Sequence, residues 1–204
     1  MSGLAGSWIT RHWLIATLAG AALLGIIGAS LGVYAGLYNV AADVPHTQPV
    51  FWLMTTARER SVAVRAKDIE VPNDLADPKR ITLGAGQYAE MCAGCHLAPG
   101  MKRTEIARGL YPRAPELRRK GRLTPAEQFW VVKHGIKMTG MPAWGVTHDD
   151  EVLWDVVAFL RKLPDLSADQ YQALVKSAPK THDEMMMDMG RDNEPDGHQK
   201  EDHH

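Results

Sequence analysis

The longest hydrophobic pattern of the chain lies near its N-terminus, where residues 13–37 carry no charged side chain. At 1.5 Å per residue, a helix over this run is long enough to cross the ~30 Å hydrocarbon core of a membrane. Aromatic residues that favour the membrane interface flank it at Trp8, Trp13, Tyr34 and Tyr38. The pattern predicts a transmembrane anchor over residues 13–38, preceded by a cytoplasmic segment, 1–12.

A cleaved signal peptide is the competing interpretation, because Val33-Tyr34-Ala35 resembles a small-residue cleavage site. The apolar run is longer than a usual signal core, and the region before it holds only Arg11 and His12 as basic residues. Length therefore favours an uncleaved anchor. Residues 38–55 contain no Lys or Arg, so the positive-inside rule places the N-terminus in the cytoplasm.

Small residues recur along one side of this span, and they would let a second helix approach closely. The stripe is formed by Ala21, Gly25, Gly28, Gly32 and Ala35, with Gly36 beside it, and a partner helix would pack on Gly25, Gly28, Gly32 and Gly36. Two interpretations stay open, which are packing against a partner transmembrane helix and a single anchor that happens to be rich in glycine.

Polar and apolar positions after the span predict helices only, and the expected fold class is all-α. Residues 39–78 form a connecting region, with a short helix opening at Pro49 and extended chain before residue 78. Residues 79–164 form a small domain with a first helix over 83–95. A second helix is predicted from the capping box of Thr124 and Glu127 to Gly135, and a third from Thr147 to the stop at Pro164. Residues 165–204 form a C-terminal extension whose acidic end is expected to be disordered.

The chemistry of the chain is concentrated in Cys92-Ala93-Gly94-Cys95-His96, which contains both cysteines of the protein. Cys-x-x-Cys-His is the attachment site of c-type haem, where each thiol bonds a vinyl group and the histidine supplies an axial nitrogen to iron. A redox pair, half of a zinc site and a disulfide are the alternatives. None of these needs the trailing histidine, and a zinc site would need two further ligands. The motif predicts one covalent haem c.

A second axial ligand is expected from a methionine. Met141 is the preferred candidate, because Gly140 and Pro142 make a stiff loop that can present its thioether to iron. Met138 is the runner-up, and ordinary packing is its alternative role. Tyr111 and Arg113 are candidates for hydrogen bonds to the haem propionates.

Taken together, these motifs resemble class I cytochrome c. The resemblance rests on Gly84 and Tyr88 before the cysteine motif, on Gly140-Met141-Pro142-Ala143-Trp144, and on Trp154 and Phe159 in the last helix. It covers residues 79–164 and is strongest to short single-haem bacterial domains, which also occur in membrane-anchored cytochromes and in cytochrome subunits of larger complexes.

The resemblance implies a helical domain built around one covalent haem, with Trp144 among the haem surroundings. It implies that Gly84 and Tyr88 pack against Trp154 and Val157. It also implies a backbone carbonyl that accepts the Nδ1 proton of the haem histidine, and Pro99 is the candidate. A small residue often follows the histidine in the family, whereas this chain has Leu97.

The formal net charge of -1 over 204 residues gives no reason to expect a nucleic-acid partner, but the charge is segregated. Between residues 102 and 122, eight Lys and Arg face only Glu105 and Glu116. This basic segment is interpreted as a solvated surface, as a steering patch for an acidic redox partner, or as a surface that the acidic tail covers. The tail is also rich in residues that bind copper weakly in other contexts, namely His182, Met185, Met186, Met187, Met189, His198, His203 and His204.

The leading functional hypothesis is a one-electron carrier rather than an enzyme, anchored to the bacterial inner membrane with its haem domain in the periplasm. It would serve respiratory or dehydrogenase partners, either free-standing or as the cytochrome subunit of an oxidoreductase complex. Two alternatives remain. One is a haem-based ligand sensor in which Met141 dissociates, and the other is a copper-handling cytochrome that uses the tail.

Overall fold

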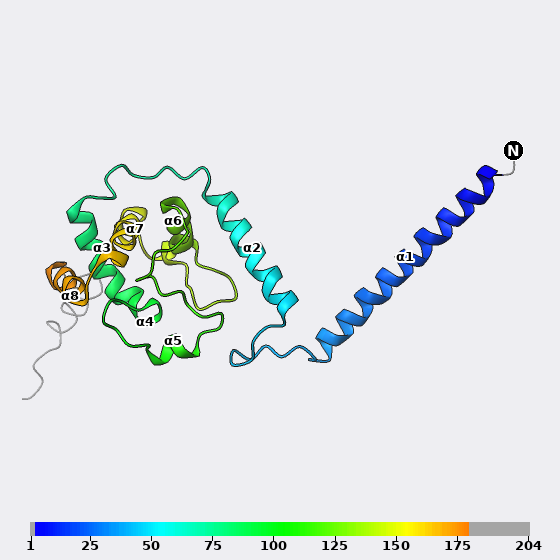
Figure 1. Cartoon of the computed structure of the whole chain (residues 1–204), viewed down its shortest axis with the longest axis horizontal. Helices are drawn as coiled ribbons and strands as arrows, with labels where there is room; N and C mark the ends of the chain where they lie inside the picture. Colours follow the sequence, from blue (N-terminus) through cyan, green and yellow to red (C-terminus); the bar gives the residue numbers. More distant parts are fainter. Residues whose placement is uncertain (1–2, 180–204) are drawn as a thin grey trace, which may run out of the picture. The chain divides into compact units, whose positions relative to one another are not determined.

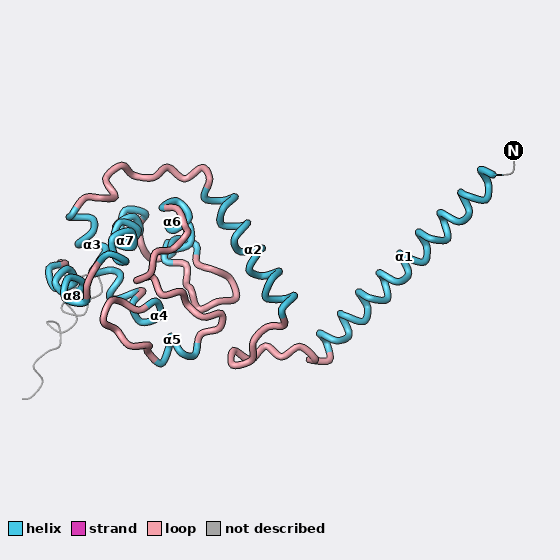
Figure 2. The backbone as a smooth tube through the Cα atoms, viewed as in Figure 1, coloured by secondary structure: helices cyan, strands magenta, loops and turns pink. Residues whose placement is uncertain are grey.

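A computed structural model describes residues 3–179, and all regular structure in them is helical (Figures 1 and 2). This confirms the all-α fold class. The chain divides into two units, residues 1–44 and 45–204. The first unit is essentially one helix, and the second contains all the candidate site residues in the described range.

Helix α1 (Gly3–Tyr34) includes one segment, Thr10–Tyr34, that is long and apolar enough to cross a membrane, with a mean hydropathy of 2.2. Its end is a Schellman motif, in which the Leu37 N–H donates to the Gly32 carbonyl at 3.0 Å and the Gly36 N–H to the Val33 carbonyl at 3.0 Å. Gly36 has a φ of 68°, the left-handed conformation that this motif requires. Gly36 therefore terminates the helix. Of the proposed glycine contacts, Gly25, Gly28 and Gly32 lie within α1, whereas Gly36 follows its last residue.

Helix α2 (Gln48–Ala66) begins close to Pro49, as expected, but it is a long helix rather than a short one. Its last turns bury Val62 and Ala66, and α2 packs against α6 (Pro125–His134). The connecting region from Pro45 onward is thus part of the second unit.

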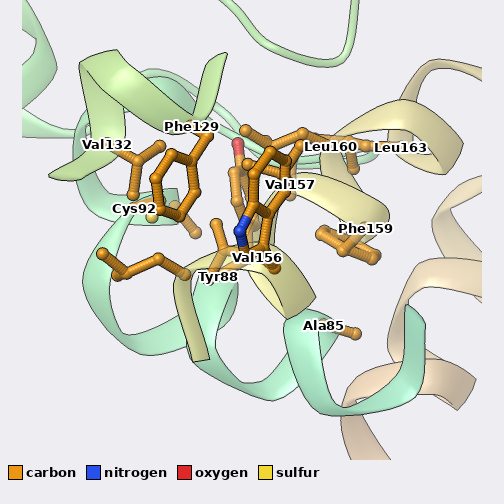
Figure 3. Packing of buried hydrophobic residues seen from close by; sticks show 14 of the residues in the cluster. Ala85, Tyr88, Cys92, Phe129, Val132, Val156, Val157, Phe159, Leu160 and Leu163 are labelled. Atoms are coloured by element: carbon orange, nitrogen blue, oxygen red, sulfur yellow. The ribbon is translucent and has the colours of Figure 1, made fainter. Parts of the chain in front are cut away.

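The core of the second unit lies between α3 (Pro78–Met91), α6 and α7 (Asp150–Lys162). Figure 3 shows the side chains that converge there. The rings of Phe129 and Trp154 stack at 4.1 Å between centroids, and Tyr88 lies 5.2 Å from Phe159. Helices α3 and α7 touch at Gly84, where a Cβ atom would lie 1.9 Å from the Asp155 carbonyl oxygen. Gly84 therefore contacts Asp155 and Phe159 of α7. The resemblance implies contacts with Trp154 and Val157, which lie one and two residues earlier on the same helix.

Two helix starts differ from the expectation. Helix α3 begins five residues before Leu83, because the Asp77 carboxylate accepts a hydrogen bond from the Lys79 N–H at 2.7 Å and caps it. Helix α7 has Asp149 at its N-cap rather than Thr147. The Thr147 N–H closes the preceding 3-10 turn (Trp144–Val146) by donating to the Trp144 carbonyl at 3.1 Å.

The start of α3 is also fixed by Arg80. Its guanidinium donates to Asp74, Glu151 and Asp155, each at 2.8 Å. These bonds hold the end of the connecting region against α7. The hydrogen bond from Arg80 lowers the pKa of Asp74, whereas burial raises the pKa of Asp155.

A further helix, α8 (Ala168–Ser177), lies in the C-terminal extension, for which the sequence analysis predicts no helix. Ser167 and Gln170 form its capping box. Tyr171 on this helix is buried in the core, and α8 packs on α3. The acidic tail predicted after Thr181 lies outside the described residues.

Candidate functional site

The two cysteines and the histidine are carried on one turn that continues from α3. Cys92 follows α3, and α4 (Ala93–His96) comes directly after it. The N–H groups of Cys95 and His96 both donate to the Cys92 carbonyl, at 3.1 and 2.9 Å. No disulfide joins the two cysteines, and Cys92 is buried whereas Cys95 is half-buried. Because the backbone is helical here, all three side chains have defined directions from one short segment.

The imidazole of His96 is oriented by a second segment of the chain. Its Nδ1 lies 2.8 Å from the Pro115 carbonyl oxygen, and a carbonyl can only accept, so Nδ1 carries the proton. The His96 carbonyl in turn accepts from the Leu117 N–H at 3.3 Å. Burial lowers the pKa of His96, with the Pro115 carbonyl acting in the opposite direction. The result is a neutral ring whose Nε2 lone pair is available to a metal.

Leu97, directly after the histidine, is the most unusual residue of the site. It has a φ of 63° and ψ of 168°, a conformation that side-chain-bearing residues avoid, and it is only 2% exposed. The buried Tyr88 hydroxyl donates to its carbonyl. The structure thus accommodates Leu97 where a small residue was expected, with its backbone held by α3 and its side chain in the interior.

Met141 is presented by a tight loop after α6. Its N–H donates to the Thr139 hydroxyl at 3.1 Å, and its carbonyl accepts from the Ile136 N–H at 3.2 Å. Gly135 has a φ of 62°, and a Cβ atom there would lie 2.6 Å from the Pro142 carbonyl carbon, so the loop closes tightly on itself. The Met141 side chain is partly buried against the core. By contrast, Met138 is 82% exposed.

The donor set fits a haem attached through two thioether bonds. Burial raises the pKa of the Cys92 thiol to about 12, with a smaller contribution from Cys95. A structural zinc site needs four protein ligands, and within residues 3–179 no group of three or more His, Cys, Asp or Glu side chains could hold a metal ion. A reactive redox pair would need a thiolate of low pKa, whereas the pKa of Cys92 is raised. Addition across a vinyl group leaves a neutral thioether, which suits a buried position. Cys92, Cys95 and His96 would hold the group, and Met141 lies on a loop packed on the same core.

The family described as cytochrome C oxidase, cbb3-type, subunit III matches residues 79–160. This range contains Cys92, Cys95, His96 and Met141 in one helical domain. Residues 79–160 are a class I cytochrome c domain. The family carries haem c covalently and transfers electrons. No curated protein and no solved structure matches the chain.

Pro99 does not take the role expected from the resemblance in this cytochrome. It occupies a turn in which the Met101 N–H donates to the Ala98 carbonyl at 3.0 Å and Gly100 has a φ of 80°. Proline and glycine suit the two central positions of such a type II turn. The turn faces α8, since a Cβ atom on Gly100 would lie 2.8 Å from the Ala168 Cβ. The carbonyl paired with the histidine is that of Pro115, which lies much further along the chain.

The other candidates for the haem surroundings take different positions in the cytochrome domain. Trp144 is partly buried and packs on the core. The Tyr111 hydroxyl accepts a hydrogen bond from the His46 N–H at 2.9 Å, and the two rings meet edge to face at 5.0 Å. Arg113 is exposed. His46 lies 65 positions from Tyr111 in the chain, so no local sequence pattern predicts this contact.

The basic segment 102–122 is partly neutralised by its own acid. Glu116 contacts Arg103 at 2.8 Å, Arg118 at 3.0 Å and Arg119 at 3.5 Å. Hydrogen bonds from Arg118 and Arg103 lower the pKa of Glu116, so it is ionised at neutral pH. Lys120 contacts Asp165 at 3.3 Å. The bases of this segment are therefore not equivalent, and four of them are paired with acids.

Proposed function

We propose that this cytochrome is anchored in the bacterial inner membrane and passes single electrons between protein partners, with His96 and Met141 as the axial ligands of its haem. The observation that carries the proposal is the fixed His96 ring. Its Nδ1 faces the Pro115 carbonyl, so Nε2 is the nitrogen presented to iron. The family match over residues 79–160 supports the haem and the electron-transfer role.

When bound, haem c supplies a one-electron couple at iron. The chain's own residues fix the histidine through Pro115 and hold Met141 on a closed loop. Hydrogen bonds within the protein hold both ligands in place. Little rearrangement is therefore needed when the charge on the iron changes. Filling both axial positions leaves no open site for a substrate, which favours a carrier over a catalyst.

The membrane anchor is proposed to be α1, with the cytochrome domain on the periplasmic side. Arg11 precedes the span, and residues 38–55 contain no Lys or Arg, which supports this direction. A periplasm-active reporter fused after His204 should be functional, and the protein should resist extraction from membranes by carbonate. A mature protein that starts near Gly36 would contradict the anchor and indicate a signal peptide instead.

The partner is proposed to dock through an acidic surface onto the basic segment 102–122. The test variant, Lys102→Glu, Arg108→Glu and Arg122→Glu, reverses bases that contact no acid among residues 3–179. A matched variant makes the same change in net charge on other helices, at the exposed Arg161, Lys162 and Lys176.

The measurement is the rate of electron exchange with a soluble redox protein of strongly negative charge. At low salt the test variant should be slower by about tenfold, since complementary fields raise association rates by about 10 to 10³. The difference should shrink as salt shortens the ~10 Å Debye length found at 0.1 M. Equal slowing by both variants would show that net charge acts without a specific docking surface.

The binding of carbon monoxide distinguishes an electron carrier from the alternative, a haem-based ligand sensor. The partly buried Met141, held at both its N–H and its carbonyl, favours a sixth ligand that stays bound. The ferrous protein should therefore bind carbon monoxide slowly and incompletely at neutral pH. Rapid, complete binding would contradict the carrier and favour the sensor. The copper hypothesis rests on tail residues outside 3–179, and nothing in the described residues supports it.

A further inference from the structure

The first half of α2 exposes a run of large apolar side chains. Phe51, Trp52, Leu53 and Met54 are 44, 67, 58 and 41% exposed. Four consecutive residues point in all directions around a helix, so this part of α2 is apolar on every side. We call residues 50–54 the apolar turn.

The distribution along α2 is the reverse of that in an ordinary surface helix. Such a helix turns its large apolar residues inward and its polar residues outward. In α2 the buried residues are the small Val62 and Ala66 near the far end, where the helix packs on α6. The larger and more hydrophobic side chains remain outside. An exposed apolar group of this size is characteristic of an interaction surface.

The position of the apolar turn in the chain indicates what covers it. Helix α1 ends at Tyr34 and α2 begins at Gln48. Even if fully extended, the residues between them reach only about 45 Å. The start of α2 therefore lies no further than about 45 Å from the end of α1, so the membrane surface is within reach of the apolar turn. The side chains also match that environment, because Trp is enriched at membrane interfaces, and Trp, Phe and Leu form the apolar face of helices that lie in the interface.

We propose that the apolar turn of α2 inserts into the phospholipid interface, with the helix held at the boundary between headgroups and acyl chains. This rests on the proposed membrane anchor. The next turns of α2 carry Arg58, Arg60 and Arg65 against the single acid Glu59, which suits anionic headgroups. Because α2 is packed on α6, contact with lipid at the apolar turn fixes which side of the cytochrome domain faces the membrane.

The test places a photoreactive residue in the full chain, reconstituted in nanodiscs of phosphatidylethanolamine and phosphatidylglycerol. The three variants are Trp52→benzoylphenylalanine, Leu24→benzoylphenylalanine within the span, and Gln172→benzoylphenylalanine. Gln172 is an exposed residue of α8, and within the second unit α8 lies on the side away from α2 (Figure 1). After irradiation, mass spectrometry measures the lipid adduct at each position.

We expect adducts at positions 24 and 52, with position 52 about tenfold above position 172, since interfacial binding buries the apolar face in the headgroup region. Adding Phe51→Glu and Leu53→Glu should lower the adduct at 52 about tenfold, whereas Ile106→Glu on α5 (Glu105–Gly109) should not. Lipid adducts at 24 but not at 52 would overturn the inference and leave the anchor intact. If position 24 gave no lipid adduct, the result would instead contradict the membrane anchor. Crosslinks from 52 to a second copy of the chain, or within one chain, would also overturn the inference.

Discussion

Replacing Met141 by alanine is expected to lower the reduction potential by a few tenths of a volt, because axial ligands set haem potentials over a range of about 0.8 V. A thioether stabilises the ferrous state, and its loss leaves water or a stronger donor on the sixth position. Protein-film voltammetry measures the potential, and the sulfur-to-iron charge-transfer band of the oxidised protein reports the bond itself. In Met141→Ala this band should disappear.

Met138→Ala is the matched control, because it removes a second methionine from the same loop. Met138 is 82% exposed, so its loss should leave the potential and the charge-transfer band nearly unchanged. The assignment of Met141 would be wrong if Met138→Ala removed the band and Met141→Ala did not.

Gly84→Ala is expected to be the most damaging single-methyl change in the domain. A Cβ atom at position 84 would lie 1.9 Å from the Asp155 carbonyl oxygen and 2.9 Å from the Phe159 Cβ. Neither neighbour is the flexible end of a side chain, so α3 and α7 must separate. Overpacking of this kind costs about 3 kcal/mol or more. Denaturant unfolding of the full chain in detergent, followed by circular dichroism, measures the loss.

Gly109→Ala on α5 provides the comparison, because a Cβ atom there meets nothing within 4 Å. Where the conformation allows it, glycine to alanine is neutral or stabilises by about 0.4–1 kcal/mol. Equal denaturation midpoints for Gly84→Ala and Gly109→Ala would contradict the close packing of α3 on α7 at Gly84.

The helices that could be predicted from the sequence are those with a local signal. Helix α6 begins where Thr124 and Glu127 form their capping box, and all the atoms of that signal lie within one turn. The start of α7 was placed wrongly because Thr147 and Asp149 are both good capping residues. The choice between them depends on the 3-10 turn that occupies Thr147, and this is a feature of the folded loop.

Other features depend on contacts that a single sequence does not display. The resemblance implies a partner for the His96 Nδ1 close to the histidine, at Pro99, whereas the chain returns 19 positions later to supply the Pro115 carbonyl. Pro112 and Pro115 favour extended backbone, but they give no direction for its return. Helix α8 also has a local signal, since Ser167 and Gln170 form a capping box like that of α6, but the sequence interpretation of residues 165–204 contains no helix. The contribution of α8 to the fold depends on Tyr171, which is buried in the core, and this burial is a property of the folded domain.

The family match spans residues 79–160, but the folded unit extends beyond it at both ends. Packing passes from α2 to α6, α7, α3 and finally α8. Cutting the gene at the limits of the family match would remove Val62 and Ala66 from one flank and Tyr171 from the other, and each cut would expose apolar surface. An excised fragment for crystallography or spectroscopy should therefore run from Pro45 to Ser177. Within such a fragment the two attachment points, to the anchor and to the tail, lie on different flanks, so either appendage can be shortened or exchanged independently of the other.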